Sequence, residues 1–289
     1  MALDLLHERI RKLKNPLIVD FSAKREHIPE HILSEEENFP AAYERFCREI
    51  LRGLKDTVPG VRFPFGFFAL MGADGLERLK KLLREAKTLG YYVVLDAPEI
   101  LSPWAAEAAA ETVFGTDEFP CDALVISPYI GSDALKPFAS FCQKGEKDLF
   151  AVIRSANKSA AELQDLLTGS RHVYGATAET VSRAGESSLA KCGYSCICGV
   201  VGAGSGDMLR QLRMKHNRLF LMVDGLEYPS GNIKNCSSAF DRFGHGAVIC
   251  AGSSVTAAWR ESEGEDYICD AVAAADRIKK NIGRYISIL

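Results

Sequence analysis

Eight short runs of β-branched and apolar residues recur along this chain of 289 residues, and longer stretches with helical periodicity separate them. The runs are almost continuously apolar, which is typical of parallel strands that are buried on both faces. Eight such strands alternating with helices predict an α/β protein with a closed (β/α)8 TIM barrel. The predicted strands cover residues 16–21, 61–65, 91–97, 123–128, 149–156, 194–202, 218–225 and 247–253.

The segments between these runs have the apolar spacing of helices. An amphipathic helix is expected at the start of the chain, and a charged segment, 23–40, is expected to cross one end of the barrel as a loop with a short helix. A doubly wound open sheet is the main alternative, but a Gly-rich turn after the first strand is missing. Without a linker of biased composition, residues 1–289 are predicted to form a single domain. Further helices are predicted at 41–58, 72–90, 159–167 and 265–289.

Charge and hydropathy narrow the function classes. The formal net charge is −3, and acidic and basic residues are interspersed, so neither nucleic acid nor an anionic membrane surface is an expected partner. No apolar run reaches the roughly 18 residues of a membrane span. The first residues lack the apolar core and cleavage site of a signal peptide, which predicts a cytoplasmic protein.

The nine cysteines indicate reduced thiols rather than a disulfide framework or a metal centre. Their number is odd, and the closest three, Cys192, Cys196 and Cys198, lack the paired C-x2-C spacing of a zinc site. The six histidines also lack a ligand-like spacing. We therefore expect no metal at these residues.

Several segments carry a family resemblance. NPLIVDFSAKREHIPEHIL, FPFGFFALMGADGLERLKKLL, GYYVVLDA, DALVISPYIGSDALKPF, LFAVIRSANKSAAELQDL, GVVGAG and FGHGAVICAGSSVTAAW occur in this order along the chain. Together they resemble the bacterial long-form orotidine 5'-monophosphate decarboxylases over roughly residues 5–285. The resemblance implies a TIM barrel that forms a homodimer and takes part in pyrimidine biosynthesis.

The same resemblance implies a particular chemistry. Members of that family remove the carboxylate of orotidine monophosphate to give UMP without metal or cofactor. They use an alternating Lys-Asp-Lys-Asp network at strand ends, to which one aspartate comes across the dimer interface. A lysine protonates the developing carbanion, and the gripped phosphate supplies binding energy that is used at the reacting carbon.

The catalytic positions of this chain depart from that pattern. The family's D-A-K-R-G-D-I signature corresponds to residues 96–102, where Asp96 is retained, Pro98 replaces the catalytic lysine and Leu101 replaces the trans aspartate. Arg62 replaces the second lysine of the network, and arginine is effectively never deprotonated. Asp96 and Arg62 are therefore candidate catalytic remnants. The alternative is a structural role for Asp96, either as a cap of the next helix or in an inert ion pair with Arg62.

The ligand-contacting positions are altered as well. Ser22 replaces an aspartate after the first strand, Ala156 replaces the serine of R-T-S-N, Pro229 replaces a glutamine, and Ser253 replaces the phosphate-gripping arginine. The glycine-rich stretch 199–207 lacks a P-loop ending but could hold an anion through backbone N–H groups. By position, the candidate binding residues are Ser22, Arg154, Asn157, Ser230, Gly231, Gly252 and Ser253.

Three functional hypotheses remain open. The chain could be a family member that no longer decarboxylates and acts as a binding or assembly partner, as a homodimer or with an active paralogue, with at most weak affinity for a nucleotide or phosphate. It could instead be an enzyme with altered chemistry built on Asp96, Arg62 and Arg154. It could also be a residual decarboxylase. In the first case the apolar loop after the third strand packs across a dimer or folds into its own site.

Overall fold

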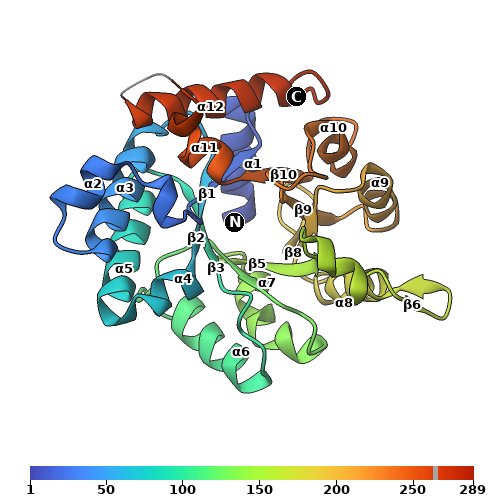
Figure 1. Cartoon of the computed structure of the whole chain (residues 1–289). Coiled ribbons are helices and arrows are strands. Elements are labelled where there is room, and N and C mark those ends of the chain that lie inside the picture. The colour runs from blue at the N-terminus through green and yellow to red at the C-terminus, as the bar shows by residue number, and fades with distance from the viewer. Residues whose placement is uncertain (263–265) are drawn as a thin grey trace.

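A computed structural model of the chain describes residues 1–262 and 266–289, and eight parallel strands in them close into a barrel (Figure 1). The strand order around the barrel is β1-β10-β9-β8-β5-β4-β3-β2. The predicted TIM barrel is confirmed, and each predicted strand corresponds to one observed strand. These strands are β1 (Leu17–Asp20), β2 (Gly60–Pro64), β3 (Tyr92–Asp96), β4 (Ala123–Ile126), β5 (Asp148–Arg154), β8 (Ser195–Gly202), β9 (Leu219–Asp224) and β10 (Ala247–Ala251).

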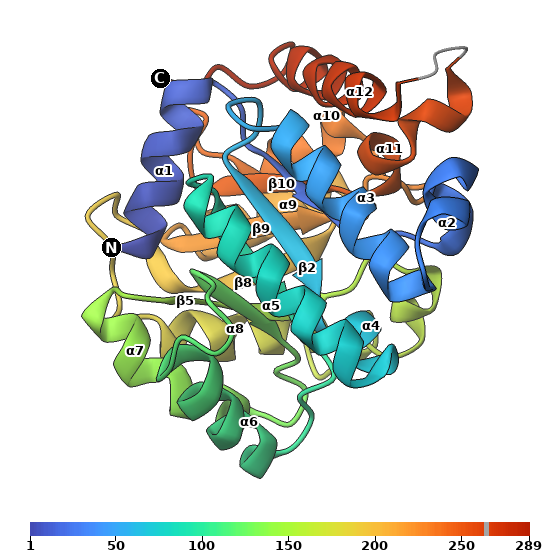
Figure 2. The same cartoon turned by 90° about the vertical axis from the view of Figure 1, so that its left-hand side faces the viewer.

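The long helices form a layer around the barrel (Figures 1 and 2). The burial pattern explains the apolar runs, because every residue of β3, β4, β8 and β10 is buried between the barrel interior and this layer. The helices are α1 (Ala2–Leu13), α2 (Glu30–Glu35), α3 (Phe39–Gly53), α4 (Phe65–Leu70), α5 (Gly72–Thr88), α6 (Pro103–Ala109), α7 (Ala139–Lys144), α8 (Val173–Ala184), α9 (Gly206–Lys215), α10 (Ile233–Cys236), α11 (Ser253–Thr256) and α12 (Tyr267–Ile282).

The helix predicted over 159–167 is wrong. A 3-10 turn, η5 (Lys158–Glu162), is followed by a two-stranded antiparallel hairpin, β6 (Leu167–Thr168) and β7 (Arg171–His172), which projects from the barrel (Figure 1). The apolar spacing that suggested a helix belongs to leucines that are exposed, Leu163, Leu166 and Leu167. A helical pattern without a core to cover carries little information about structure.

The predicted helix at the end of the chain exists as α12, although residues 263–265, where the prediction begins, lie outside the described part. The short helix expected within 23–40 is α2.

Helix α1 covers the end of the barrel at which the strands begin. Its Asp4 accepts hydrogen bonds from the backbone of Lys191 and Cys192, just before β8, and Arg9 donates to the carbonyl of Pro59, just before β2. The end of the chain lies beside α1, where Arg11 donates to the carbonyl of Leu289 (Figure 2). The opposite end, where the strands finish, is the mouth of the barrel. In the described residues no helix is both long and apolar enough to cross a membrane.

Candidate functional site at the barrel mouth

Four charged side chains from four strands meet at the mouth. Asp20, Asp96 and Asp224 are the last residues of β1, β3 and β9, and Arg62 lies in β2 directly beside Asp20 in the strand register. The carboxyl ends of barrel strands are where active sites of TIM-barrel proteins are found. We call these four residues the mouth cluster.

Arg62 is the centre of the mouth cluster. Its Nη2 lies 2.6 Å from Oδ2 of Asp96, and its Nη1 lies 3.1 Å from Oδ2 of Asp224. The same Nη1 donates to the thiol of Cys250, at 3.7 Å. Arg62 and Asp96 are each only 8% exposed, so this pair is shielded from water. The ion pair considered for Asp96 and Arg62 is therefore present in the structure.

The electrostatics of the mouth cluster are unbalanced. Burial raises the pKa of Asp20 to about 7, although Arg62 opposes this shift, and the carboxylates of Asp96 and Asp224 add to it. Burial likewise raises the pKa of Asp96, again against the effect of Arg62. Burial alone would lower the pKa of Arg62, but the three carboxylates raise it well above its ordinary value. Arg62 therefore remains a cation and cannot act as a proton donor.

Ser22 belongs to the mouth cluster through Asp20. Its backbone N–H and its Oγ both donate to Oδ1 of Asp20, at 3.1 and 2.9 Å. The side chain orients a carboxylate and, in this structure, does not reach further into the barrel. In contrast, Oδ1 of Asp96 and Nε of Arg62 are buried without a hydrogen-bond partner among the described residues.

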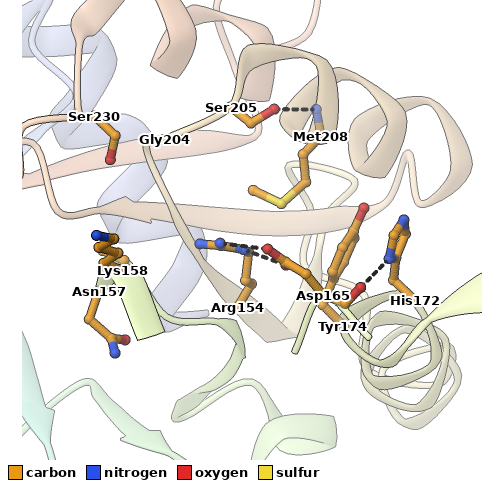
Figure 3. A pocket seen from close by; sticks show the side chains of 11 residues that line it. Arg154, Asn157, Lys158, Asp165, His172, Tyr174, Gly204, Ser205, Met208 and Ser230 are labelled. Atoms are coloured by element: carbon orange, nitrogen blue, oxygen red, sulfur yellow. Dashed lines mark hydrogen bonds and ion pairs between the residues drawn. The ribbon is translucent and has the colours of Figure 1, made fainter. Parts of the chain in front are cut away.

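Arg154 lies apart from the mouth cluster, in a cavity of about 450 Å³ beside β5 and β8 (Figure 3). Its Nε and Nη2 face the two carboxylate oxygens of Asp165, both at 2.9 Å. Asn157 and Ser230 line the same cavity. The structure thus brings Asp96 and Arg62 together but pairs Arg154 with a different acid, so the three residues of the altered-enzyme hypothesis do not form one constellation.

The remaining candidates lie at the ends of β9 and β10. Gly252 is buried just after β10, and its N–H donates to Oε1 of Glu227, which also accepts from Oγ of Ser254 at 3.0 Å. Ser253 lines a cavity of about 490 Å³ on this side of the mouth. Gly231 closes the loop after β9, where a side chain would meet the carbonyl of Gly225. A carboxylate therefore occupies the backbone donor at the end of β10.

The loop after β3 is exposed. Leu101 is 57% exposed, and Trp104, at the start of α6, is 77% exposed, whereas Ile100 packs partly against the core. Pro98 also lies on the surface. With these exposures, the side chains of Leu101 and Trp104 do not fill the mouth of their own barrel.

Four acidic residues with roles in this region were missed from the sequence. Asp20 and Asp224 lie one residue before the ends of the predicted strands 16–21 and 218–225, which is a signal that could have placed them at the mouth. Asp165 and Glu227 lie in loops and carry no such signal. Their partners depend on loop conformations that a periodicity argument does not predict.

These features define a class: a TIM barrel with a buried charge network at the carboxyl ends of its strands. A scan against protein-family models found no match. A decarboxylase of orotidine 5'-phosphate from Rhodopirellula baltica is 30% identical over 263 residues, which cover 89% of this chain and 84% of that protein. The corresponding protein of Clostridium novyi is 27% identical over 287 residues, covering 98% and 99%.

Solved structures show the same fold. A putative orotidine monophosphate decarboxylase from Toxoplasma gondii matches with a TM-score of 0.82 and 20% identity, over 98% of this chain and 96% of that one. The Leishmania donovani OMP decarboxylase matches with a TM-score of 0.77 and 24% identity, over 98% of each chain. The chain belongs to the orotidine 5'-phosphate decarboxylase family, as its sequence resemblance predicted.

Proposed function

We propose that this family member no longer decarboxylates orotidine 5'-phosphate and acts in the cytoplasm as a binding or assembly partner, in the form of a homodimer. The observation that carries the proposal is the loss of the lysine that donates the proton in the family: Pro98 replaces it, and Arg62 lies between Asp96 and Asp224. No lysine occurs between Lys87 and Lys136, so the loop after β3 cannot supply one.

The charge balance of the mouth supports the same conclusion. Orotidine 5'-phosphate carries a carboxylate and a phosphate, whereas the mouth cluster contains three carboxyl groups and one guanidinium. At the end of β10, the N–H of Gly252 already donates to the carboxylate of Glu227. An anionic ligand would therefore meet repulsion without the arginine that grips phosphate in the family.

The exposed loop after β3 supports the homodimer. An isolated chain would expose Leu101 and Trp104 to water, and apolar side chains of this kind are enriched where proteins associate. In the family this loop meets the partner subunit, so a second copy of this chain is the proposed occupant. An active paralogue that presents the same surface is the competing partner.

Activity is tested by following UMP formation from orotidine 5'-phosphate, with a family member that retains D-x-K-x-x-D as the positive control. We expect no turnover, because residues that act as a unit in catalysis lose nearly all activity when one is missing. Turnover above roughly 1 per second, an ordinary enzyme rate, would contradict the proposal. Titration calorimetry with UMP should likewise show no saturable heat, whereas tight binding would indicate a retained ligand site.

Association is tested by size exclusion with light scattering. The purified chain should have the mass of two chains, and Leu101→Asp should weaken this dimer because it buries a carboxylate in an apolar contact. Met214→Asp is the matched control, since Met214 is also strongly exposed but lies on α9. The mass of one chain at micromolar concentration would reject the homodimer. If a larger complex formed only after an active paralogue was added, the paralogue would be the partner.

A further inference from the structure

We propose that Glu227 is an internal anion that occupies the anion-binding end of the barrel and excludes phosphate groups from it. This inference rests on the proposed function, since it explains how a member of this family avoids binding a phosphorylated ligand. It assigns a specificity-determining role to a residue in the loop between β9 and α10.

The first support is the contact itself. One oxygen of the Glu227 carboxylate, Oε1, accepts from both the N–H of Gly252 and the Oγ of Ser254. A backbone N–H together with a hydroxyl is the donor set that proteins offer to phosphate oxygens. The carboxylate of Glu227 therefore satisfies donors that would suit an external anion equally well.

The second support is the location of this contact. Strands β9 and β10 are the seventh and eighth strands of the barrel, and α11 is a short helix that begins directly after β10. Phosphate sites of TIM barrels are frequently formed by these two loops and by the start of such a helix. Ser253 and Ser254 are the first residues of α11.

The third support is space and charge beside the carboxylate. A cavity of about 490 Å³ adjoins it, lined by Glu227, Ser253 and Ser254 and by two basic side chains, His27 and Arg260. A phosphate has room to approach the same donors. The carboxylate of Glu227 competes with the phosphate. Because this carboxylate belongs to the chain, its effective concentration at these donors is high.

The loop geometry shows that the position of Glu227 is built into the fold. Gly225 has a φ of +81°, and the loop is tied by hydrogen bonds from the N–H of Tyr228 to Gly225 and from the N–H of Gly231 to Tyr228. A side chain at Gly231 would come within 2.4 Å of the carbonyl of Gly225. These constraints form a tight turn that directs Glu227 toward Gly252.

The test compares inorganic phosphate binding by wild type, Glu227→Gln and Glu261→Gln in calorimetry. Glu261 lines the same cavity, so its variant makes the same change of charge without touching Gly252. We expect Glu227→Gln to bind phosphate at least about tenfold more tightly than wild type, a typical value for one charge-assisted contact, and Glu261→Gln to match wild type. Equal gains in both variants, or no gain in Glu227→Gln, would overturn the proposal.

A second measurement does not depend on the folding of a variant. Hydrogen exchange of wild type should show the Gly252 amide more protected than those of Ser253 and Ser254, and an unprotected Gly252 amide would refute the contact. Assaying UMP formation with Glu227→Gln separates the two proposals. Phosphate binding without turnover supports both, turnover would overturn the proposed function alone, and a failure to gain phosphate would overturn only the role of Glu227.

Discussion

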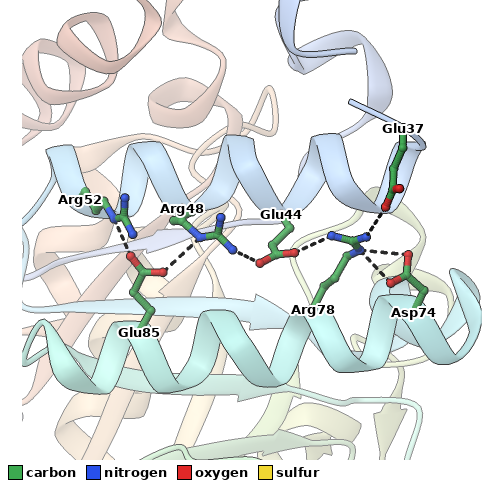
Figure 4. Close-up of polar contacts among 7 residues, drawn as sticks. All are labelled: Glu37, Glu44, Arg48, Arg52, Asp74, Arg78 and Glu85. Atoms are coloured by element: carbon green, nitrogen blue, oxygen red, sulfur yellow. Dashed lines mark hydrogen bonds and ion pairs between the residues drawn. The ribbon is translucent and has the colours of Figure 1, made fainter. Parts of the chain in front are cut away.

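Two ion networks in this molecule differ in their exposure to water and in their ratio of cations to carboxylates. Along the outside of the barrel, α3 and α5 are joined by a ladder of three arginines and four acids, Glu37, Glu44, Arg48, Arg52, Asp74, Arg78 and Glu85 (Figure 4). At the mouth, one arginine serves three carboxyl groups. In the ladder each arginine has an acid within reach and most members contact water. In the mouth cluster Arg62 and Asp96 are buried, Asp20 and Asp224 are partly buried, and Arg62 is the one cation of the four residues.

The difference shows what burial does to a charge pattern. In the ladder, Glu44 lies between Arg48 and Arg78, and water screens the outer members, so each pair contributes little by itself. In the mouth cluster one guanidinium cannot compensate three carboxylates, and the pKa of Asp20 rises to about 7 as a result of burial. The ladder therefore stabilises the fold modestly, while the mouth cluster depends on one residue, Arg62.

Among variants of the two networks, those of Arg62 are expected to change the free energy of unfolding most. Arg62→Met should lower the free energy of unfolding by about 3–5 kcal/mol, because it leaves buried carboxyl groups without their cation. Equilibrium urea unfolding at pH 8 measures the effect. Arg62→Lys is the control that keeps a cation at this position and should lose clearly less. If both variants unfolded like wild type, the mouth cluster would be held by packing and not by charge.

Asp20→Asn should change stability in a pH-dependent direction. A carboxyl whose pKa is about 7 in the folded state and about 3.8 in the unfolded state binds more protons when folded between these values. Stability contributed by this group therefore falls as pH rises from 4 to 7 and stays low above 7. The amide removes this cost, so the variant should be more stable than wild type by up to about 4 kcal/mol at pH 8, at about 1.4 kcal/mol for each unit of the pKa change.

At pH 4.5 the same variant should be close to wild type, because Asp20 is then protonated in the folded protein. Asparagine keeps an oxygen that can accept from Ser22, so the local turn is preserved. Asp117→Asn, at an exposed position, is the control for the general change of charge. A gain at pH 4.5 equal to the gain at pH 8 would show that the shift in Asp20 is not its cause.

The two networks also differ in how far the sequence predicts them. The eight apolar runs predict the barrel, because strands that are buried on both faces are typical of parallel sheets covered by helices. The pairing of Arg62 with Asp96 was one of two structural roles considered for Asp96. The other role, as a cap of the next helix, belongs to Ser102. Asp20 and Asp224 come together in the mouth cluster because the barrel closes with a particular register. No local sequence pattern specifies this register.

Loops were predicted least well. The exposed hairpin β6–β7 replaced an expected helix, and Glu227 was not considered at all, because its partners Gly252 and Ser254 lie 25 and 27 positions away. Polar contacts of this range form between loops whose conformations are set by glycines such as Gly225. The sequence therefore predicted where the site lies better than what occupies it.

Within the ladder, Glu44 should matter more than any other acid. Its side chain is only 4% exposed and accepts from Arg78 at 2.7 Å as well as from Arg48. Glu44→Gln should cost about 1–2 kcal/mol, since the hydrogen bonds of a charged acceptor are lost while both arginines keep some contact with water. Urea unfolding measures this, and Glu37→Gln, at the exposed end of the ladder, should have little effect. If Glu44→Gln lowered the free energy of unfolding more than Arg62→Met, the ladder would stabilise the fold more than the mouth cluster does.

Arg52 should show the smallest effect, and it tests whether the ladder acts as a unit. Its side chain is 62% exposed and its Nε lies 2.6 Å from Oε1 of Glu85, which also faces Arg48 at 3.2 Å. Because water screens this pair and Arg48 remains beside Glu85, Arg52→Ala should change the free energy of unfolding by less than about 0.5 kcal/mol. A double-mutant cycle with Glu85→Gln measures the coupling directly. Coupling above about 1 kcal/mol would show that the ladder is cooperative to its exposed end, and high salt should then weaken it, whereas a value near zero leaves the pair as a solvated contact.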